Sequence, residues 1–169
     1  MAIIKKLNDV EPQFGENCFL AENAVVIGDV VMGDECSIWY GAVLRGDVNS
    51  IRLGNRVNIQ DNAVLHTLYQ RSKVIMGNNI TVGHSSVIHG ATIHDNVLIG
   101  IGAIILDNAV INEGAIIAAG SVVLDGSIVE PGTLWAGVPA KMIKKVDAEQ
   151  VEMIKKLASN YVMYAGWYK

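Results

Sequence analysis

Three of the chain's four histidines, His66, His84 and His89, lie within a short stretch of the sequence. Neutral imidazole is a common protein ligand for zinc, cobalt and iron. The spacings of 18 and 5 residues between them match neither two histidines one turn apart on a helix nor a Cys/His finger. One metal can therefore join these side chains only if the fold brings separated positions together.

A repeat of six residues organises most of the chain. An aliphatic residue returns at every sixth position, a small or β-branched residue usually follows four positions later, and Gly, Asn and Asp occupy the turns between. This repeat predicts an all-β solenoid, a parallel β-helix with three short strands per coil of 18 residues and coils stacked about 4.8 Å apart. The aliphatic positions are Leu20, Val26, Met32, Ile38, Leu44, Leu53, Ile59, Leu65, Met76, Val82, Ile88, Ile93, Ile99, Ile105, Ile111, Ile117, Val123 and Val129.

The end of the chain has a different periodicity. The hexapeptide pattern stops before residue 140, and a helical pattern begins at Asp147, a residue type favoured at helix N-caps. We expect a single domain over residues 1–169, with a β-helix over about 10–140 and a C-terminal α-helix over about 147–165 packed on its outside. The expected apolar stripe of that helix is Val151, Ile154, Leu157, Ala158, Tyr161 and Val162.

The overall composition excludes several classes of function. The net charge of −4 leaves no electrostatic footprint for nucleic acid or an anionic membrane, and no apolar stretch is long enough to span a bilayer. We expect a cytoplasmic protein. Cys18 and Cys36, 18 residues apart, occupy the same slot on successive coils, either as a redox pair or, as we expect, as stacked core thiols.

Two steps of the repeat are too long. One runs nine residues from Leu44 to Leu53, and the other runs eleven from Leu65 to Met76. If the extra residues form loops at the corners of the coil, the number of strands per coil is preserved. Leu44, Leu65 and Ile88 then occupy equivalent positions on three successive coils.

Arg45, His66 and His89 directly follow these three positions, so the register predicts an outward column with neighbours about one strand spacing apart. His84 lies in the preceding hexad, on the adjacent face, and points away from the two stacked histidines of its own chain. Only another subunit can bring it to them. We therefore predict a homotrimer with a metal site at each interface. His94 has no stacked partner, and we interpret it as a surface residue.

Three stretches resemble the gamma-class carbonic anhydrase family, and the coil and terminal helix extend the similarity over nearly the whole chain. The resemblance implies a left-handed β-helix and three zinc ligands, His66, His84 and His89, with cobalt or ferrous iron as alternatives. The matching stretches are VLRGDVNSIRLGNRVNIQDNAVLH (43–66), GHSSVIHG (83–90) and WAGVPAK (135–141).

The same resemblance implies an activity. Arg45 and Asp47 would support the interface and the site, Gln60 would lie beside the metal-bound water, and Tyr161 would be a site tyrosine. Three imidazoles leave a tetrahedral zinc one open position, where the pKa of water falls to about 7. The expected reaction is reversible hydration of CO2 to bicarbonate by zinc-bound hydroxide. We interpret Asp61 as a structural corner residue.

Two departures from the family pattern argue for slow turnover. The residue after Asp47 is Val48, and segment 67–75 contains no acid, although founding members carry glutamates at these places and one of them exports the proton. Three alternatives stay open: a metal-dependent thioesterase acting on coenzyme A thioesters, a non-catalytic metal-binding scaffold, and a hexapeptide acyltransferase with a histidine general base.

Overall fold

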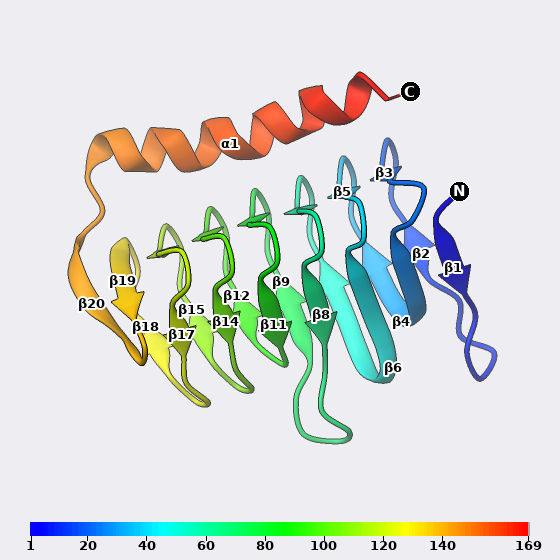
Figure 1. Ribbon diagram of the computed structural model, residues 1–169, viewed down its shortest axis with the longest axis horizontal. Helices are drawn as coiled ribbons and strands as arrows, with labels where there is room; N and C mark the ends of the chain where they lie inside the picture. Colours follow the sequence, from blue (N-terminus) through cyan, green and yellow to red (C-terminus); the bar gives the residue numbers. More distant parts are fainter. Residues whose placement is uncertain (169) are drawn as a thin grey trace.

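The computed structural model describes residues 1–168 and shows a parallel β-helix with one α-helix lying along it (Figure 1). This confirms the β-helix of hexapeptide repeats and the C-terminal helix. The strands stack on three faces, and each strand pairs in parallel with its equivalent on the next coil. Two long strands, β4 (Val25–Met32) and β6 (Val43–Leu53), bend around a corner and join the first two faces.

The three faces are defined by their strands. The first face holds the N-terminal halves of β4 and β6 with β1 (Ile3–Lys5), β8 (Val64–His66), β11 (Val87–His89), β14 (Ile104–Ile105) and β17 (Val122–Val123). The second face holds the C-terminal halves of β4 and β6 with β2 (Gln13–Phe14), β9 (Val74–Met76), β12 (Thr92–Ile93), β15 (Val110–Ile111) and β18 (Ile128–Val129). The third face holds β3 (Phe19–Leu20), β5 (Ser37–Ile38), β7 (Asn58–Ile59), β10 (Thr81–Val82), β13 (Leu98–Ile99), β16 (Ile116–Ile117), β19 (Thr133–Gly137) and the antiparallel β20 (Ala140–Lys145).

The core is the interior of the coil. Every aliphatic position expected from the repeat is buried, apart from the partly exposed Leu20. Small residues such as Ala24, Ala63 and Ala103 fill the tight corners and are also fully buried. Burying one Val, Leu or Ile side chain stabilises the fold by about 1.5–3 kcal/mol, so the regular columns supply most of the hydrophobic stabilisation.

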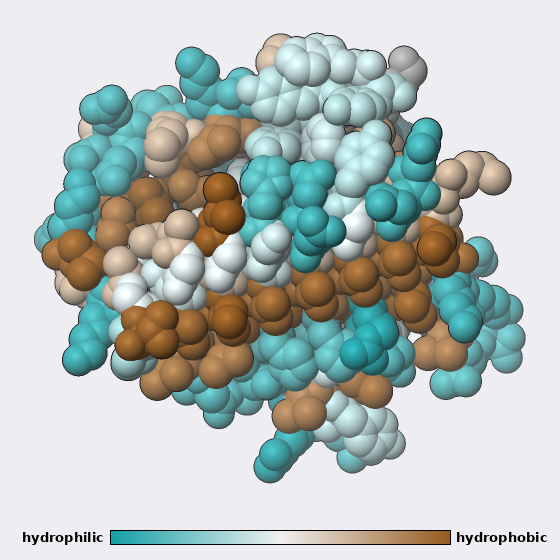
Figure 2. Space-filling view, viewed as in Figure 1, coloured by the Kyte–Doolittle hydropathy of each residue, from teal (hydrophilic) through white to brown (hydrophobic). Residues whose placement is uncertain are grey.

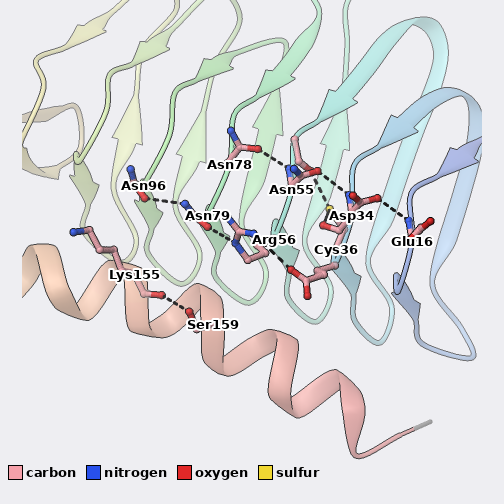
Figure 3. A network of polar contacts seen from close by, with 12 residues as sticks. Glu16, Asp34, Cys36, Asn55, Arg56, Asn78, Asn79, Asn96, Lys155 and Ser159 are labelled. Carbon is pink, nitrogen blue, oxygen red and sulfur yellow. Dashed lines mark hydrogen bonds and ion pairs between the residues drawn. The ribbon is translucent and has the colours of Figure 1, made fainter.

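Side-chain ladders close the corners between coils (Figure 3). The backbone N–H of Glu16 donates to Asp34 Oδ1 at 2.8 Å, and the N–H of Asp34 donates to Asn55 Oδ1 at 2.8 Å. The ladder continues from the N–H of Asn55 to Asn78 Oδ1 at 2.9 Å and from the N–H of Asn78 to Asp95 Oδ1 at 2.8 Å. These bonds satisfy turn donors that the short strands leave unpaired.

Both long steps preserve the stacking register. Between the pairs Gly28–Gly46 and Val30–Ile51, β6 carries three more residues than β4, and these form a bulge at the corner. The second insertion, residues 67–73, leaves the coil as a loop between β8 and β9 (Figure 1). The expectation that the extra residues lie at corners is therefore confirmed.

The helix α1 (Ala148–Gly166) closely matches the expected range. Asp147 is its N-cap, and a capping box forms because the N–H of Gln150 donates to Asp147 Oδ1 at 2.9 Å while Gln150 Oε1 accepts from the Asp147 N–H at 3.2 Å. Nineteen helical residues extend about 28 Å, so α1 runs back over the third face toward the first coils and contacts both β10 and β5 (Figure 1). Its buried residues are Ile154, Ala158 and Ala165.

Cys18 and Cys36 lie on successive coils as free thiols. Each donates to a backbone carbonyl of the next coil, Cys18 to Gly33 at 3.2 Å and Cys36 to Gly54 at 3.1 Å. Hydrogen bonding with Cys18, followed by burial, raises the pKa of the Cys36 thiol above its usual range. This arrangement agrees with stacked core thiols. Within residues 1–168, no helix is both long and apolar enough to cross a membrane.

Candidate metal centre

The expected column of Arg45, His66 and His89 forms on the first face. His66 pairs directly with His89, and Arg45 immediately follows the residue that pairs with Leu65. His66 Nδ1 lies 3.1 Å from His89 Nε2. Two imidazole ligands of one tetrahedral zinc, each about 2.0–2.1 Å from the ion, have their nitrogens about 3.3 Å apart. The observed distance is that of a hydrogen bond between the two rings, and it is close to the separation expected for two ligands of one metal.

A carboxylate and a guanidinium orient His66. Its Nε2 lies 3.0 Å from Asp47 Oδ1, and the other oxygen of Asp47 accepts from Arg45. Burial raises the pKa of Asp47, but the hydrogen bonds from Arg45 and His66 outweigh it and hold the net pKa below its usual value. Asp47 is thus a stable anion that fixes the ring of His66.

Asp107 does the same for His89, and nothing in the sequence analysis pointed to it. Asp107 Oδ2 lies 2.8 Å from His89 Nδ1, and Asp107 Oδ1 accepts from the hydroxyl of Ser72. Burial raises the pKa of Asp107, while the bonds from Ser72 and His89 lower it to below its usual value. The available signal was spacing, because Asp107 follows His89 by 18 residues, one full coil.

Ser72 ties the inserted loop to this network. Its hydroxyl oxygen accepts from the backbone N–H of Leu68 at 3.1 Å and donates to Asp107. The loop, whose sequence stands out only by lacking an acid, is thereby anchored through Asp107 to His89.

His84 lies on another part of the coil, in the turn that follows β10 of the third face. Its Nδ1 is 2.8 Å from Asp61 Oδ2, and its side chain is 44% exposed. Asp61, which we interpreted as structural, therefore also orients a candidate ligand. Each of the three histidines has one ring nitrogen on a carboxylate, the arrangement typical of metal-binding imidazoles. Among residues 1–168, no group of three or more His, Cys, Asp and Glu within one chain is placed to hold a metal ion.

Gln60 and Tyr161 lie with His84 around a cavity of about 420 Å³ between the third face and α1. Gln60 is only 5% exposed, and its Nε2 donates to Asn58 Oδ1 at 3.1 Å. Burial, followed by the negative charge of Asp61, raises the pKa of Tyr161, so its hydroxyl stays protonated at neutral pH. The aliphatic part of the lining is Leu98, Ile99, Ile101, Ala119 and Leu157.

The sequence-derived site residues thus fall into two groups on one chain. The first group, which we call the face half-site, consists of Arg45, Asp47, His66, His89 and Asp107. The second group, the edge half-site, consists of Gln60, Asp61, His84 and Tyr161. His94 is exposed and lies on neither half-site.

A row of aliphatic side chains runs beside the face half-site. The strand pairings place these residues in one outward column across six coils, and each is partly exposed. A continuous hydrophobic row crosses the viewed face along the length of the coil (Figure 2). Such a stripe indicates an interaction surface. Its members are Val25, Val43, Val64, Val87, Ile104 and Val122.

Comparison with known proteins supports the repeat and places the chain among relatives. The family described as bacterial transferase hexapeptide (six repeats) matches residues 11–46 and 90–125. The carbonic anhydrase of Geobacillus kaustophilus is 44% identical over 94% of this chain and 86% of its own length. Gamma carbonic anhydrase 2, mitochondrial, of Arabidopsis thaliana is 44% identical over 93% of this chain, which spans 58% of that longer protein.

A solved structure has the same architecture. The hexapeptide transferase family protein from Anaplasma phagocytophilum superposes with a TM-score of 0.93 at 41% identity, over 99% of this chain and 98% of that one. The match includes the coil and the terminal helix, because almost the whole of both chains is aligned.

Proposed function

Since the chain belongs to the gamma carbonic anhydrase family, we propose that it catalyses the reversible hydration of CO2 as a metal-dependent homotrimer. One observation carries the proposal. The three histidines each have one ring nitrogen on a carboxylate, yet they are divided between the face half-site and the edge half-site. A complete three-histidine site then requires two copies of the chain.

His66 and His89 of one copy and His84 of the next would hold the metal, with zinc as the expected ion and cobalt or ferrous iron as alternatives. When bound, this ion supplies a Lewis acid that lets water lose a proton near neutral pH. Asp47 and Asp107 keep the rings of His66 and His89 in fixed orientations, and their own low pKa values keep them anionic.

Gln60 and Tyr161 would act on the substrate side. The amide of Gln60 is held by Asn58, so its position is fixed before substrate enters. From there it can orient a CO2 or bicarbonate oxygen by a hydrogen bond. Tyr161 lines the same cavity, and its protonated hydroxyl would be a second donor.

The aliphatic stripe explains how the half-sites would meet. In the proposed trimer, the edge of one β-helix that carries His84 packs on the first face of the next chain. This contact buries the aliphatic stripe beside His66 and His89 and brings His84 of the neighbouring chain to that face. This contact joins two different surfaces, and a rotation of one third of a turn closes it into a ring of three. Burial of the partly exposed column supplies the hydrophobic driving force.

Mixing two inactive variants tests the shared site. His66→Ala removes the face half-site and His84→Ala removes the edge half-site, so neither protein alone should retain the bound metal. After unfolding and refolding together in equal amounts, random trimers should regain metal at about one quarter of their sites, since each site needs one intact half from each of two chains. Metal content measured by mass spectrometry reads the result.

His94→Ala is the matched control, because this exposed histidine lies on neither half-site and should keep about one metal per chain. No recovery of metal in the mixture, with both variants folded, would show that each site is built within one chain. A metal-loaded monomer in light scattering would contradict the proposal in the same way.

The absence of an acid at position 48 and in segment 67–75 predicts a buffer effect. Val48 and segment 67–75 offer no carboxylate to carry a proton away from the site. General acid–base assistance is typically worth about 10²–10⁴-fold, so hydration should be slow in dilute buffer and should rise with buffer concentration. Stopped-flow measurements across a buffer series check this. Fast hydration that is independent of buffer would identify another proton carrier.

Thioester hydrolysis is a second candidate, favoured by the size of the cavity beside His84. Its volume of about 420 Å³ is much larger than CO2 requires. Its aliphatic lining suits an acyl chain. Release of free thiol from short-chain acyl coenzyme A by the metal-loaded protein would support this reaction. Leu157→Trp, which narrows the cavity, should slow thioester hydrolysis more than CO2 hydration.

We also propose that residues 1–169 fold as one domain, because α1 buries Ile154 and Ala158 against the coil instead of extending away from it. A single unfolding transition seen equally by circular dichroism and tryptophan fluorescence is expected. The cytoplasmic location stays a prediction; the Arabidopsis relative is named as mitochondrial.

A further inference from the structure

A second recess lies on the third face, where the C-terminal end of α1 crosses the first coils. It encloses about 260 Å³ and is lined by six aromatic side chains and one carboxylate. The proposed hydration reaction uses two of its lining residues, Asp61 and Tyr161, but gives no role to the recess itself. The lining residues are Trp39, Tyr40, Asp61, Tyr161, Tyr164, Trp167 and Tyr168. We call this the aromatic recess.

The rings of the recess hold one another in place. Trp39 meets Tyr161 edge to face at a centroid distance of 5.4 Å, and it meets Tyr168 in the same way at 5.6 Å. On the other side Tyr164 packs on Trp167 at 4.9 Å. Aromatic pairs at such distances stabilise their mutual orientation, so the walls are preorganised.

Docking of the helix explains only part of this cluster. Trp39 is 7% exposed and lies at the base as a core residue would. Trp167 and Tyr168, however, are 71% and 55% exposed at the rim, where a purely structural role needs no large rings. The carboxylate of Asp61, which also holds His84, lines the same recess as these aromatic rings.

The electrostatics of the recess favour a cation. The seven described lining residues include no Lys or Arg, and Asp61 adds a negative charge that His84 partly shields through its hydrogen bond. Burial, followed by Tyr168 and the negative charges of Glu22 and Asp61, raises the pKa of Tyr40. Aromatic faces are themselves electron-rich and attract cations within about 6 Å of the ring centre.

We propose that the aromatic recess binds a quaternary ammonium group. Such a group has an apolar surface, a delocalised positive charge and no hydrogen-bond donor, so it gains from aromatic walls and a nearby carboxylate without needing directional acceptors. A hydrated ammonium or guanidinium would lose more water on entering than these walls can replace. The site does not depend on a metal.

The test compares choline with 3,3-dimethyl-1-butanol (dimethylbutanol), in which a carbon replaces the charged nitrogen. Calorimetric titration of the full-length protein and line broadening of the ligand methyl signals measure the binding of each ligand. Because the two ligands share shape and apolar area, the difference isolates the charge. A preference of about 1.4 kcal/mol for a partly desolvated cation corresponds to about tenfold tighter binding of choline. Equal affinities, or no choline binding at millimolar concentration, would overturn the proposal.

Variants locate the site. Trp167→Leu should weaken choline binding several-fold without unfolding the protein, because this ring is mostly exposed. Asp61→Asn should weaken binding of choline and leave that of dimethylbutanol unchanged. Tyr69→Leu, which removes another exposed aromatic ring from the loop after β8, is the matched control and should bind choline normally. Unchanged binding in both Trp167→Leu and Asp61→Asn would refute this location.

Choline binding should survive removal of metal by a chelator. This separates the proposal from the hydration activity, since a protein that lacks that activity should still bind choline at the aromatic recess. Loss of choline binding in the chelated, folded protein would instead place the cation at the metal site and overturn the assignment.

Discussion

The face half-site and the edge half-site are built in different ways. In the face half-site, stacked strands carry Arg45, His66 and His89 at equivalent places on successive coils, so the register alone brings them together. In the edge half-site, His84 comes from a turn of the coil, whereas Tyr161 comes from α1. The face half-site depends on the stacking of strands within one solenoid. The edge half-site depends also on the docking of α1 onto that solenoid. Changes in association, in ligand orientation and in the helix should therefore have separable effects.

The largest effect should come from breaking the contact that unites the half-sites. Val87→Asp puts a carboxylate in the aliphatic stripe. Val87 is directly before the buried Ile88 on β11 and two positions before His89. Burying that charge at an interface costs several kcal/mol, so the trimer should dissociate and each chain should lose its metal. Light scattering and metal analysis check both outcomes.

Ile128→Asp is the control for this change, because Ile128 is 64% exposed on the second face, away from the stripe. It should leave both the mass and the metal content unchanged. A trimer that persists in Val87→Asp would show that the stripe faces solvent, and the proposed packing of edge on face would then be wrong.

A smaller effect is expected within the face half-site. Asp107→Asn removes the charge that holds His89 while nearly preserving shape, and loss of such a carboxylate typically weakens metal affinity by about 10–100-fold. Competition with a chelator measures the affinity. Asp125→Asn, one coil further along and exposed, should have no effect. Equal affinities for wild type and Asp107→Asn would mean that stacking alone orients His89.

The fold could be predicted almost completely, because its signal is periodic. Each hexad repeats the same requirement for a buried aliphatic residue and a tight turn, and the two long steps were visible as interruptions between Leu44 and Leu53 and between Leu65 and Met76. The hand of the coil came only from the family resemblance, since periodicity does not distinguish it. The column of Arg45 with two histidines followed from counting coils.

The polar contacts around the histidines were harder to predict. The sequence predicts only a structural role for Asp61 and does not single out Asp107, because an Asp in a corner is also an ordinary turn residue. Ser72 lies in an insertion outside the repeat, so no periodicity constrains it. Such contacts depend on side-chain directions that register does not specify.

The smallest effect should come from the start of α1, which supports only the edge half-site. The backbone N–H of Gln150, followed by Lys144, holds the pKa of Asp147 below its usual value. A lowered pKa in the folded protein means that the stabilisation is present above the ordinary Asp pKa and is lost as the pH falls through the lowered value. Asp147→Ala should therefore lower the melting temperature slightly at neutral pH, and this difference should shrink in acid. Asp147→Asn keeps a capping oxygen and should lie closer to wild type. Thermal melts followed by far-ultraviolet circular dichroism measure all three proteins.

Metal content should stay unchanged in these variants, because the first turn of α1 contributes no residue to the face half-site. A loss of metal in Asp147→Ala would show that helix docking also supports the stacked histidines.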